Sequence, residues 1–249
     1  MTQKRGYKRG YPVAVLIGLE DDRAAVWRIF SNVVKPEKTL WLERTREEPR
    51  TLYNFHESII NTLRPMLKEG VGSIVLASPS RTNYAQLLIT HVRQHHTWLI
   101  QGPNKATFSE TTGSAGTLSE VATLTRTRQF NRLISDTTFE ETEHLAGMLE
   151  KRLNAPDQNT VALFSLKEVE DLVTTAYRSG RPKPEHILLT DKYLQNSREK
   201  SRIHRFLQIA SNRNVKTRIV EAESPAGKKL TQLGGLVCLA HIKHSLGRS

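Results

Sequence analysis

The sequence is nearly devoid of cysteine: Cys238 is the one cysteine among 249 residues. A single thiol excludes a disulfide framework and a four-thiolate metal site. Long hydrophobic runs are also missing, since no apolar stretch approaches the roughly 18 to 20 residues that span a membrane. The short apolar run at 13–18 is interrupted by the acidic residues at 20–22, too early for a signal peptide. We therefore expect no membrane association and a cytoplasmic location.

Common catalytic and nucleotide-binding motifs are absent as well. There is no P-loop, no GxGxxG, no GxSxG and no HExxH. The loop at 111–116 precedes a capped helix and could offer backbone N–H groups to a phosphate, but it lacks the Gly-Lys-Ser/Thr ending. His91, His95 and His96 are clustered, and an i, i+4 pair can bind a metal, yet spacing indicates no third ligand. We interpret them as a polar helix end and expect no metal, cofactor or enzymatic activity.

The chain is strongly basic, with 37 Lys and Arg against 25 acids and a net charge of +12. Such an excess favours polyanionic partners, because neutralising phosphates releases condensed counterions. This composition indicates an RNA or DNA binder rather than a membrane-surface protein, with surplus charge for solubility as the alternative. The predicted RNA-binding residues lie in an N-terminal arm, around the first helix and near the middle of the chain: Lys4, Arg5, Lys8, Arg9, Lys35, Lys38, Arg44, Arg46, Arg50, Arg126, Arg128 and Arg132.

Hydrophobic patterning predicts an α/β protein of two domains. After a flexible basic arm at 1–12, three β-rich segments lead into a helix at 53–68, and then strands and helices alternate. The residues at 97–100 are expected to form a strand, and those at 139–153 a helix. Ser224 and Pro225 are typical of a helix start. We place the boundary near Leu133, giving domains at 13–133 and 134–249, the second an α/β/α sandwich.

Several segments taken in order suggest a family. The residues at 109–124, 133–153, 160–173 and 200–243 resemble the end of the central domain and the C-terminal domain of Pelota, and 72–88 resembles a central-domain strand and helix. The hallmark of the last part is Ser-x-x-Gly-x-x-Leu at Ser224, Gly227 and Leu230, followed by Leu-Gly-Gly. From about residue 13 to 243, the chain is similar to the family of Pelota and the archaeal-eukaryotic class 1 peptide-chain release factors.

This resemblance implies a fold and a setting. The central domain would be ribonuclease-H-like, and the C-terminal domain would resemble kink-turn-binding ribosomal proteins. Members of the family enter the ribosomal A site, where they contact rRNA or tRNA. Their partners are an elongation-factor-like GTPase and an ABC-type recycling ATPase.

Departures from the family pattern are as informative as the matches. The family's N-terminal decoding domain is expected to be absent. No Gly-Gly-Gln or Gly-Ser-Gln occurs, although the family's hydrolytic loop would fall at 42–53. In Pelota a Pro-Gly-Phe contacts the GTPase; this chain retains Pro79 but has Ser80 and Arg81 in the other two places. The predicted partner-binding residues are these three and a basic helix face: Pro79, Ser80, Arg81, Arg198, Lys200, Arg202 and Arg205.

These observations favour a non-catalytic ribosome-binding factor acting in rescue, recycling or hibernation. Two alternatives stay open. The first is a peptidyl-tRNA hydrolase or nuclease acting on stalled ribosomes, and the second is a stand-alone RNA-binding module.

Overall fold

The computed structural model describes residues 10–102, 105–154, 159–175 and 182–242. The chain forms two compact units, one comprising residues 1–67 and 71–141 and the other residues 68–70 and 142–249. Helix α4 (Arg128–Asn154) contributes to both, and Leu133 lies within it. None of the described helices is both long and apolar enough to cross a bilayer.

The first unit is built on a five-stranded sheet of order β3-β2-β1-β4-β5. Its strands are β1 (Pro12–Leu19), β2 (Arg23–Phe30), β3 (Val34–Trp41), β4 (Ser73–Ser78) and β5 (Thr107–Thr112). The first three strands form an antiparallel meander, and β4 and β5 run parallel to β1. This arrangement agrees with the ribonuclease-H-like sheet predicted for the first half of the chain.

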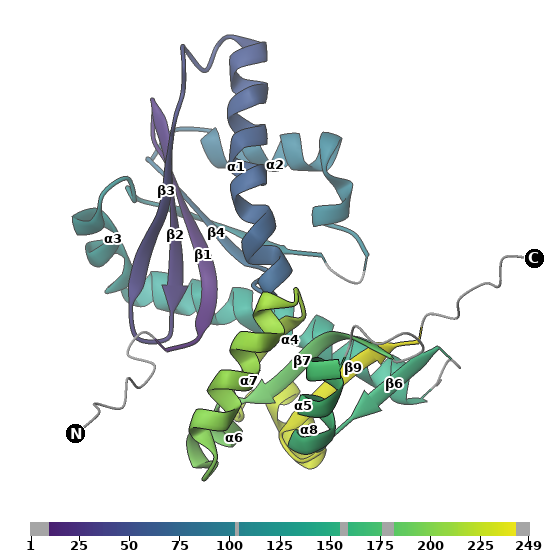
Figure 1. Cartoon of the computed structure of the whole chain (residues 1–249). Coiled ribbons are helices and arrows are strands. Elements are labelled where there is room, and N and C mark those ends of the chain that lie inside the picture. Colours follow the sequence, from purple (N-terminus) through teal and green to yellow (C-terminus); the bar gives the residue numbers. More distant parts are fainter. Residues whose placement is uncertain (1–9, 103–104, 155–158, 176–181, 243–249) are drawn as a thin grey trace, which may run out of the picture. The chain divides into compact units, whose positions relative to one another are not determined.

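Helices cover both faces of this sheet (Figure 1). On one face α1 (Pro49–Glu69) and α2 (Tyr84–His95) pack on Val15, Ile17 and their neighbours. On the other face Ala14 and Leu16 pack with residues of α3 (Leu118–Thr125) and the first half of α4. Because successive side chains of a strand point to opposite faces, a strand covered on both sides must be apolar throughout. Strand β1 meets this requirement.

The second unit is a four-stranded mixed sheet of order β6-β9-β7-β8. Its elements in chain order are β6 (Thr160–Leu163), α5 (Leu166–Thr175), β7 (Lys183–Thr190), α6 (Asp191–Asn196), α7 (Lys200–Asn212), β8 (Lys216–Val220), α8 (Pro225–Gln232) and β9 (Leu236–His241). Leu145 and Leu149 of α4 pack with Leu230 of α8 on one face of the sheet. Helices α5 and α7 contact each other and the strands. The predicted α/β fold of two domains, the second an α/β/α sandwich, is confirmed.

Two helix starts form as their sequences predict. Thr117 and Glu120 make both hydrogen bonds of a capping box at the start of α3. At the start of α8, Ser224 Oγ accepts a hydrogen bond from the backbone N–H of Gly227 at 3.0 Å, and Pro225 follows as the first helical residue. A residue with a side chain could not replace Gly227, since a Cβ there would lie 1.9 Å from the carbonyl oxygen of Glu221. The Ser-x-x-Gly spacing is therefore a packing requirement.

Two predicted elements are wrong. The residues predicted as a strand at 97–100 instead form a short 3-10 helix, η1 (Thr97–Leu99), directly after α2. Leu99 is buried in the core that α1 and α2 share, so burial rather than strand pairing fixes this segment. The fifth strand of the sheet is instead β5. Its polar sequence, TFSETT, lies at the edge of the sheet and shows little alternation of apolar and polar residues. Helix α4 begins at Arg128 instead of Phe139.

Replacing Gly227 by alanine should destabilise the second unit by about 1–3 kcal/mol, because the new methyl group would overlap the backbone of Glu221. The measurement is the free energy of unfolding in urea. Gly147→Ala in α4 is the matched control: no atom lies within 4 Å of its Cβ position. That variant should gain about 0.5–1 kcal/mol. Equal effects of the two substitutions would contradict the packing argument.

Burial raises the pKa of the Cys238 thiol from its usual 9.0 to about 12. The folded chain should therefore resist iodoacetamide at pH 8, whereas the urea-unfolded chain should be alkylated, as mass spectrometry would show. The same shift makes a prediction for stability. Because the unfolded thiol loses its proton first, stability is retained below about pH 9 and declines as the pH rises toward 12. Alkylation of the folded chain at the unfolded rate would contradict this burial.

Candidate nucleic-acid and partner interface

One edge of the first sheet collects two of the segments that carry predicted site residues, the segment from Arg44 to Arg50 and the turn from Pro79 to Arg81. Since β1, β3, β4 and β5 all run in the same direction, their carboxyl ends meet there. Helices α1, α2 and α3 begin after three of these strands. Ligand sites of open α/β sheets lie outside the carboxyl ends of the strands. We call this region the carboxyl edge; it comprises the turns and loops at 20–22, 42–48, 79–83 and 113–117.

Arg44 and Arg50 lie on the loop and first helical turn between β3 and α1, which Figure 1 shows as one continuous connection. The Arg44 side chain is 73% exposed, and its Nη1 lies 3.5 Å from Glu48 Oε2. An exposed pair of this kind contributes little, so Arg44 can exchange it for another anion. Arg50 is also exposed. Both side chains can therefore reach a phosphate.

Arg46 has a different environment from its two neighbours. Its Nε donates to the carbonyl oxygen of Asp21 at 3.1 Å, and Nη2 donates to the carbonyl oxygen of Glu20. Its guanidinium carbon lies 3.9 Å from the ring centroid of Tyr84 and 5.2 Å from that of Phe55. Desolvation lowers the pKa of this guanidinium, while the neighbouring Tyr84 and acidic groups act in the opposite direction. Arg46 thus fastens the 42–48 loop to the β1–β2 turn and to α2.

The predicted GTPase-contact residues form a turn after β4. Thr82 Oγ1 donates to the carbonyl oxygen of Pro79 at 2.8 Å and closes the turn. Ser80 and Arg81 are exposed at its tip. Arg81 has φ of 65°, in the left-handed region where glycine is favoured and other residues are uncommon. The turn therefore presents a basic side chain from a backbone conformation that suits glycine.

Trp41 also belongs to this edge, although no sequence motif singles it out. It is the last residue of β3 and is 62% exposed. The Arg23 guanidinium carbon lies 5.3 Å from its ring centroid. Exposed aromatic rings beside basic side chains can stack on unpaired bases. The two side chains become neighbours only because β2 pairs with β3, which places Arg23 opposite Trp41.

The loop at 113–117 is held by the protein's own groups. Trp27 Nε1 donates to the carbonyl oxygen of Ala115 at 2.7 Å, and the N–H of Ala115 donates to Glu20 Oε1 at 3.3 Å. The absence of a side chain at Gly18 permits this approach, since a Cβ there would lie 2.3 Å from that same carbonyl oxygen. The backbone groups of Ala115 therefore dock the loop on β1 and β2, rather than facing a phosphate.

Other predicted RNA-binding residues lie away from the carboxyl edge. Lys35 is exposed near the start of β3, at the opposite end of that strand, and Lys38 lines a shallow groove between β3 and α1. Arg126, Arg128 and Arg132 are exposed around the junction of α3 and α4. Lys4, Arg5, Lys8 and Arg9 lie outside the described residues.

In the second unit, the four predicted basic residues are exposed just before α7 and in its first two turns. Arg202 forms ion pairs with two glutamates: its Nη2 lies 2.6 Å from Glu170 Oε2, and its Nη1 lies 2.8 Å from Glu199 Oε1. These hydrogen bonds raise the pKa of the Arg202 guanidinium. Arg198, Lys200 and Arg205 have no ion pair within the described parts of the chain, so these three can meet an acidic partner.

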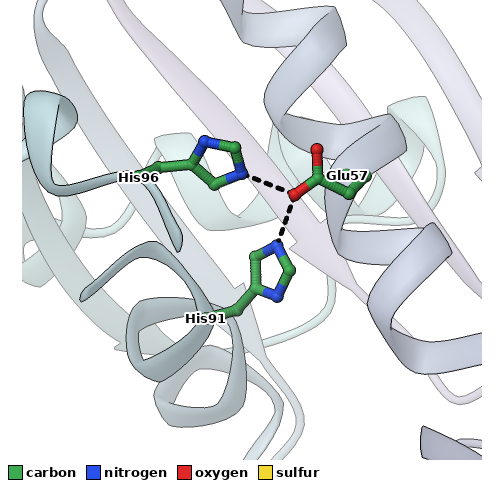
Figure 2. A group of neighbouring side chains, drawn as sticks. All are labelled: Glu57, His91 and His96. Atoms are coloured by element: carbon green, nitrogen blue, oxygen red, sulfur yellow. Dashed lines mark hydrogen bonds and ion pairs between the residues drawn. The ribbon is translucent and has the colours of Figure 1, made fainter. Parts of the chain in front are cut away.

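A second group, which we call the Glu57 cluster, lies between α1 and α2 and comprises Glu57, His91 and His96. His91 Nε2 and His96 Nε2 lie 3.0 and 2.6 Å from the same oxygen, Glu57 Oε1 (Figure 2). His95, the other member of the His group seen in the sequence, is exposed. Glu57 escaped notice because it is 34 residues from His91. The residue four positions before it on α1 is Tyr53, so the local sequence did not indicate a ligand set either.

Comparison with solved structures gives the fold a context. Archaeal Pelota, in a model of the ribosome-bound protein with ABCE1, superposes with a TM-score of 0.53 at 15% identity over 96% of this chain and 65% of that one. Saccharomyces cerevisiae Dom34 gives a TM-score of 0.49 at 18% identity, covering 94% of this chain and 64% of Dom34. The chain thus spans about two thirds of the length of these structures. No protein-family model matches the sequence. No curated protein matches it either. The resemblance predicted from the sequence is confirmed at the level of the fold.

Arg46→Ala should lower the free energy of unfolding of the first unit by about 1–3 kcal/mol, because it removes two hydrogen bonds and the packing on Tyr84. The matched control is Arg44→Ala, two residues away and exposed, which should change stability by less than about 0.5 kcal/mol. Urea unfolding monitored by tryptophan fluorescence measures both. If Arg46→Ala proves as neutral as Arg44→Ala, Arg46 does not anchor the loop.

Proposed function

We propose that this chain is a ribosome-binding translation factor of the Pelota and release-factor type, which binds without hydrolysing peptidyl-tRNA. The observation that carries the proposal is the carboxyl edge, where the exposed residues Arg44, Arg81 and Trp41 lie at the same end of the sheet and exposed Arg50 lies in the first turn of α1. Exposed cations on the same edge as an exposed aromatic ring suit a polynucleotide, because the charges meet phosphates while the ring stacks on a base. Acting on ribosomes would place the protein in the cytoplasm.

The fold supports the same setting. The superposition with a TM-score of 0.53 is with archaeal Pelota in a model of the ribosome-bound protein. The 42–48 loop occupies the place between the opening strands and the first long helix where release factors have their hydrolytic loop. In this chain the loop brings arginines to that place. We propose that Arg44 and Arg50 contact rRNA or tRNA phosphates there, with the basic residues of β3 and the α3–α4 junction extending the surface.

The same loop argues against ester hydrolysis. A loop that places a water against peptidyl-tRNA needs a side chain able to orient it, and the release-factor motif supplies glutamine with flexible glycines. Residues 42–48 contain neither glutamine nor glycine. Arg46 moreover ties the middle of the loop to Asp21 and Tyr84. The loop is thus suited to holding the exposed Arg44 in a fixed position.

Two surfaces are proposed for protein partners. The turn at Pro79, Ser80 and Arg81 would meet a translational GTPase, as Dom34 interacts with Hbs1. The basic start of α7 would meet an acidic surface, with an ABC-type recycling ATPase as the partner suggested by the complex of Pelota with ABCE1. Rescue, recycling and hibernation are the processes that such contacts would serve.

Co-sedimentation with purified ribosomes over a salt series tests the proposal. Binding of the intact chain should weaken steeply as salt rises. Arg44→Gln, Arg50→Gln and Arg81→Gln should each weaken binding and reduce the salt slope by roughly one, since each removes one phosphate contact. The matched control is Lys68→Gln, an exposed cation at the other end of α1, about 27 Å from Arg50. This control should bind as the unaltered chain does.

Four outcomes would contradict the proposal. The first is that the chain stays in the supernatant at low salt, and the second is that the three arginine variants sediment as Lys68→Gln does. Preference for isolated kinked RNA over intact ribosomes would favour the stand-alone RNA-binding module. Release of peptide from peptidyl-tRNA in the same mixtures, lost on changing Arg44 and Arg50, would favour the hydrolase.

A further inference from the structure

The Glu57 cluster is chemically suited to more than hydrogen bonding. Two imidazole nitrogens and one carboxylate oxygen converge from three backbone positions: Glu57 on α1, His91 near the C-terminal end of α2, and His96, the C-cap residue that follows α2. These three ligand atoms all lie within 4.8 Å of one another (Figure 2). We infer that the cluster is a binding site for a divalent transition-metal ion, Zn²⁺, held by Glu57, His91 and His96.

The distances fit an ion after only a small adjustment. Zinc binds imidazole nitrogen and carboxylate oxygen at about 2.0–2.1 Å, which sets ligand atoms about 3.3 Å apart in a tetrahedral site. The two nitrogen–oxygen separations are 3.0 and 2.6 Å. The carboxylate oxygen therefore has to move away by about 0.3 Å from His91 Nε2 and by about 0.7 Å from His96 Nε2. Rotation of the glutamate side chain can supply this movement, and small rotations of the two imidazole rings would adjust the separation between their nitrogens, which is at most 4.8 Å.

The donor set selects the kind of ion. Imidazole nitrogens suit zinc and other first-row transition ions, whereas Mg²⁺ and Ca²⁺ prefer oxygen ligands throughout. The protein thus presents one carboxylate oxygen and two imidazole nitrogens to an ion.

Access to the cluster is one-sided. The side chains of His91 and His96 are 6% and 9% exposed, whereas that of Glu57 is 26% exposed. Water can therefore reach the ion past Glu57. Three protein ligands with a fourth position left to water are typical of zinc sites that bind or activate a small molecule, whereas structural sites are closed by four protein ligands.

A neighbouring buried histidine adds an independent indication. His56 is 2% exposed, and its Nε2 has no hydrogen-bond partner in the described part of the chain. Its ring centroid lies 5.0 Å from that of His91. A buried polar atom without a partner calls for an explanation such as a missing ion or water. Four histidines and a glutamate gathered at one junction of two helices are more than a polar helix end requires.

Metal binding by the isolated full chain, without ribosomes, tests this inference independently of the proposed function. The chain is stripped with a chelator and titrated with Zn²⁺ against a chromophoric competitor. We expect one ion per chain, and no displacement by Mg²⁺ at equal concentration. Because loss of a group that only supports a ligand costs 10–100-fold, His96→Gln and Glu57→Gln should each weaken binding by at least about 100-fold. Zn²⁺ should also raise the melting temperature of the intact chain, though not that of either variant.

His95→Gln is the matched control, since this exposed imidazole is adjacent to His96 in sequence but lies outside the ligand set. It should retain one ion at unchanged affinity. Circular dichroism checks that each variant is folded, and Glu57→Gln preserves the size of the side chain if a histidine variant unfolds. Unsaturable or weak binding by the unaltered chain would overturn the inference. So would full affinity in the His96→Gln, Glu57→Gln double variant, or an equal loss in His95→Gln.

Discussion

The direction of the strands in the first sheet decides where its chemistry lies. Parallel pairing of β4 with β1 and with β5, together with the antiparallel meander of β1 to β3, sends four carboxyl ends to one edge. A polypeptide that leaves parallel strands at one edge must return through helices, so α1 and α2 also begin there. Residues as distant in the sequence as Trp41 and Arg81 lie at the same edge of the sheet for this reason.

Arg46 shows why an arginine-rich segment cannot be interpreted from composition alone. Arg44, Arg46 and Arg50 are equivalent in the sequence, yet Arg46 is directed inward onto Tyr84 and the carbonyl groups of the β1–β2 turn. Its guanidinium offers five donors and a flat face, so it can hold a loop where lysine could not. The anchored loop then presents Arg44 at low conformational cost, because its backbone is already ordered before a ligand arrives.

The sequence was sufficient wherever local physics determines the structure. Strands covered on both faces, such as β1, are apolar throughout. Ser224 followed by Pro225 is typical of a helix start. It failed where tertiary packing decides: β5 is polar because it is an edge strand, and its place in the sheet comes from pairing with β4. The first turns of α4 carry Phe130, Leu133 and Ile134 at helical spacing, and the surrounding arginines obscured that pattern. Glu57 could be joined to the histidines only by folding α1 against α2.

Helix α1 connects the two sites. Arg50 and Glu57 are seven residues apart on this helix, which corresponds to two turns and about 10 Å. Tyr53 lies between them on the same side of the helix, with its ring centroid 5.0 Å from that of His91. An ion bound by Glu57, His91 and His96 would fasten α1 to the end of α2. The same bond would fix the helix that carries Arg50 in its first turn. Since α1 carries both Arg50 and Glu57, a metal held within the unit would act directly on the helix whose Arg50 is proposed to contact a phosphate.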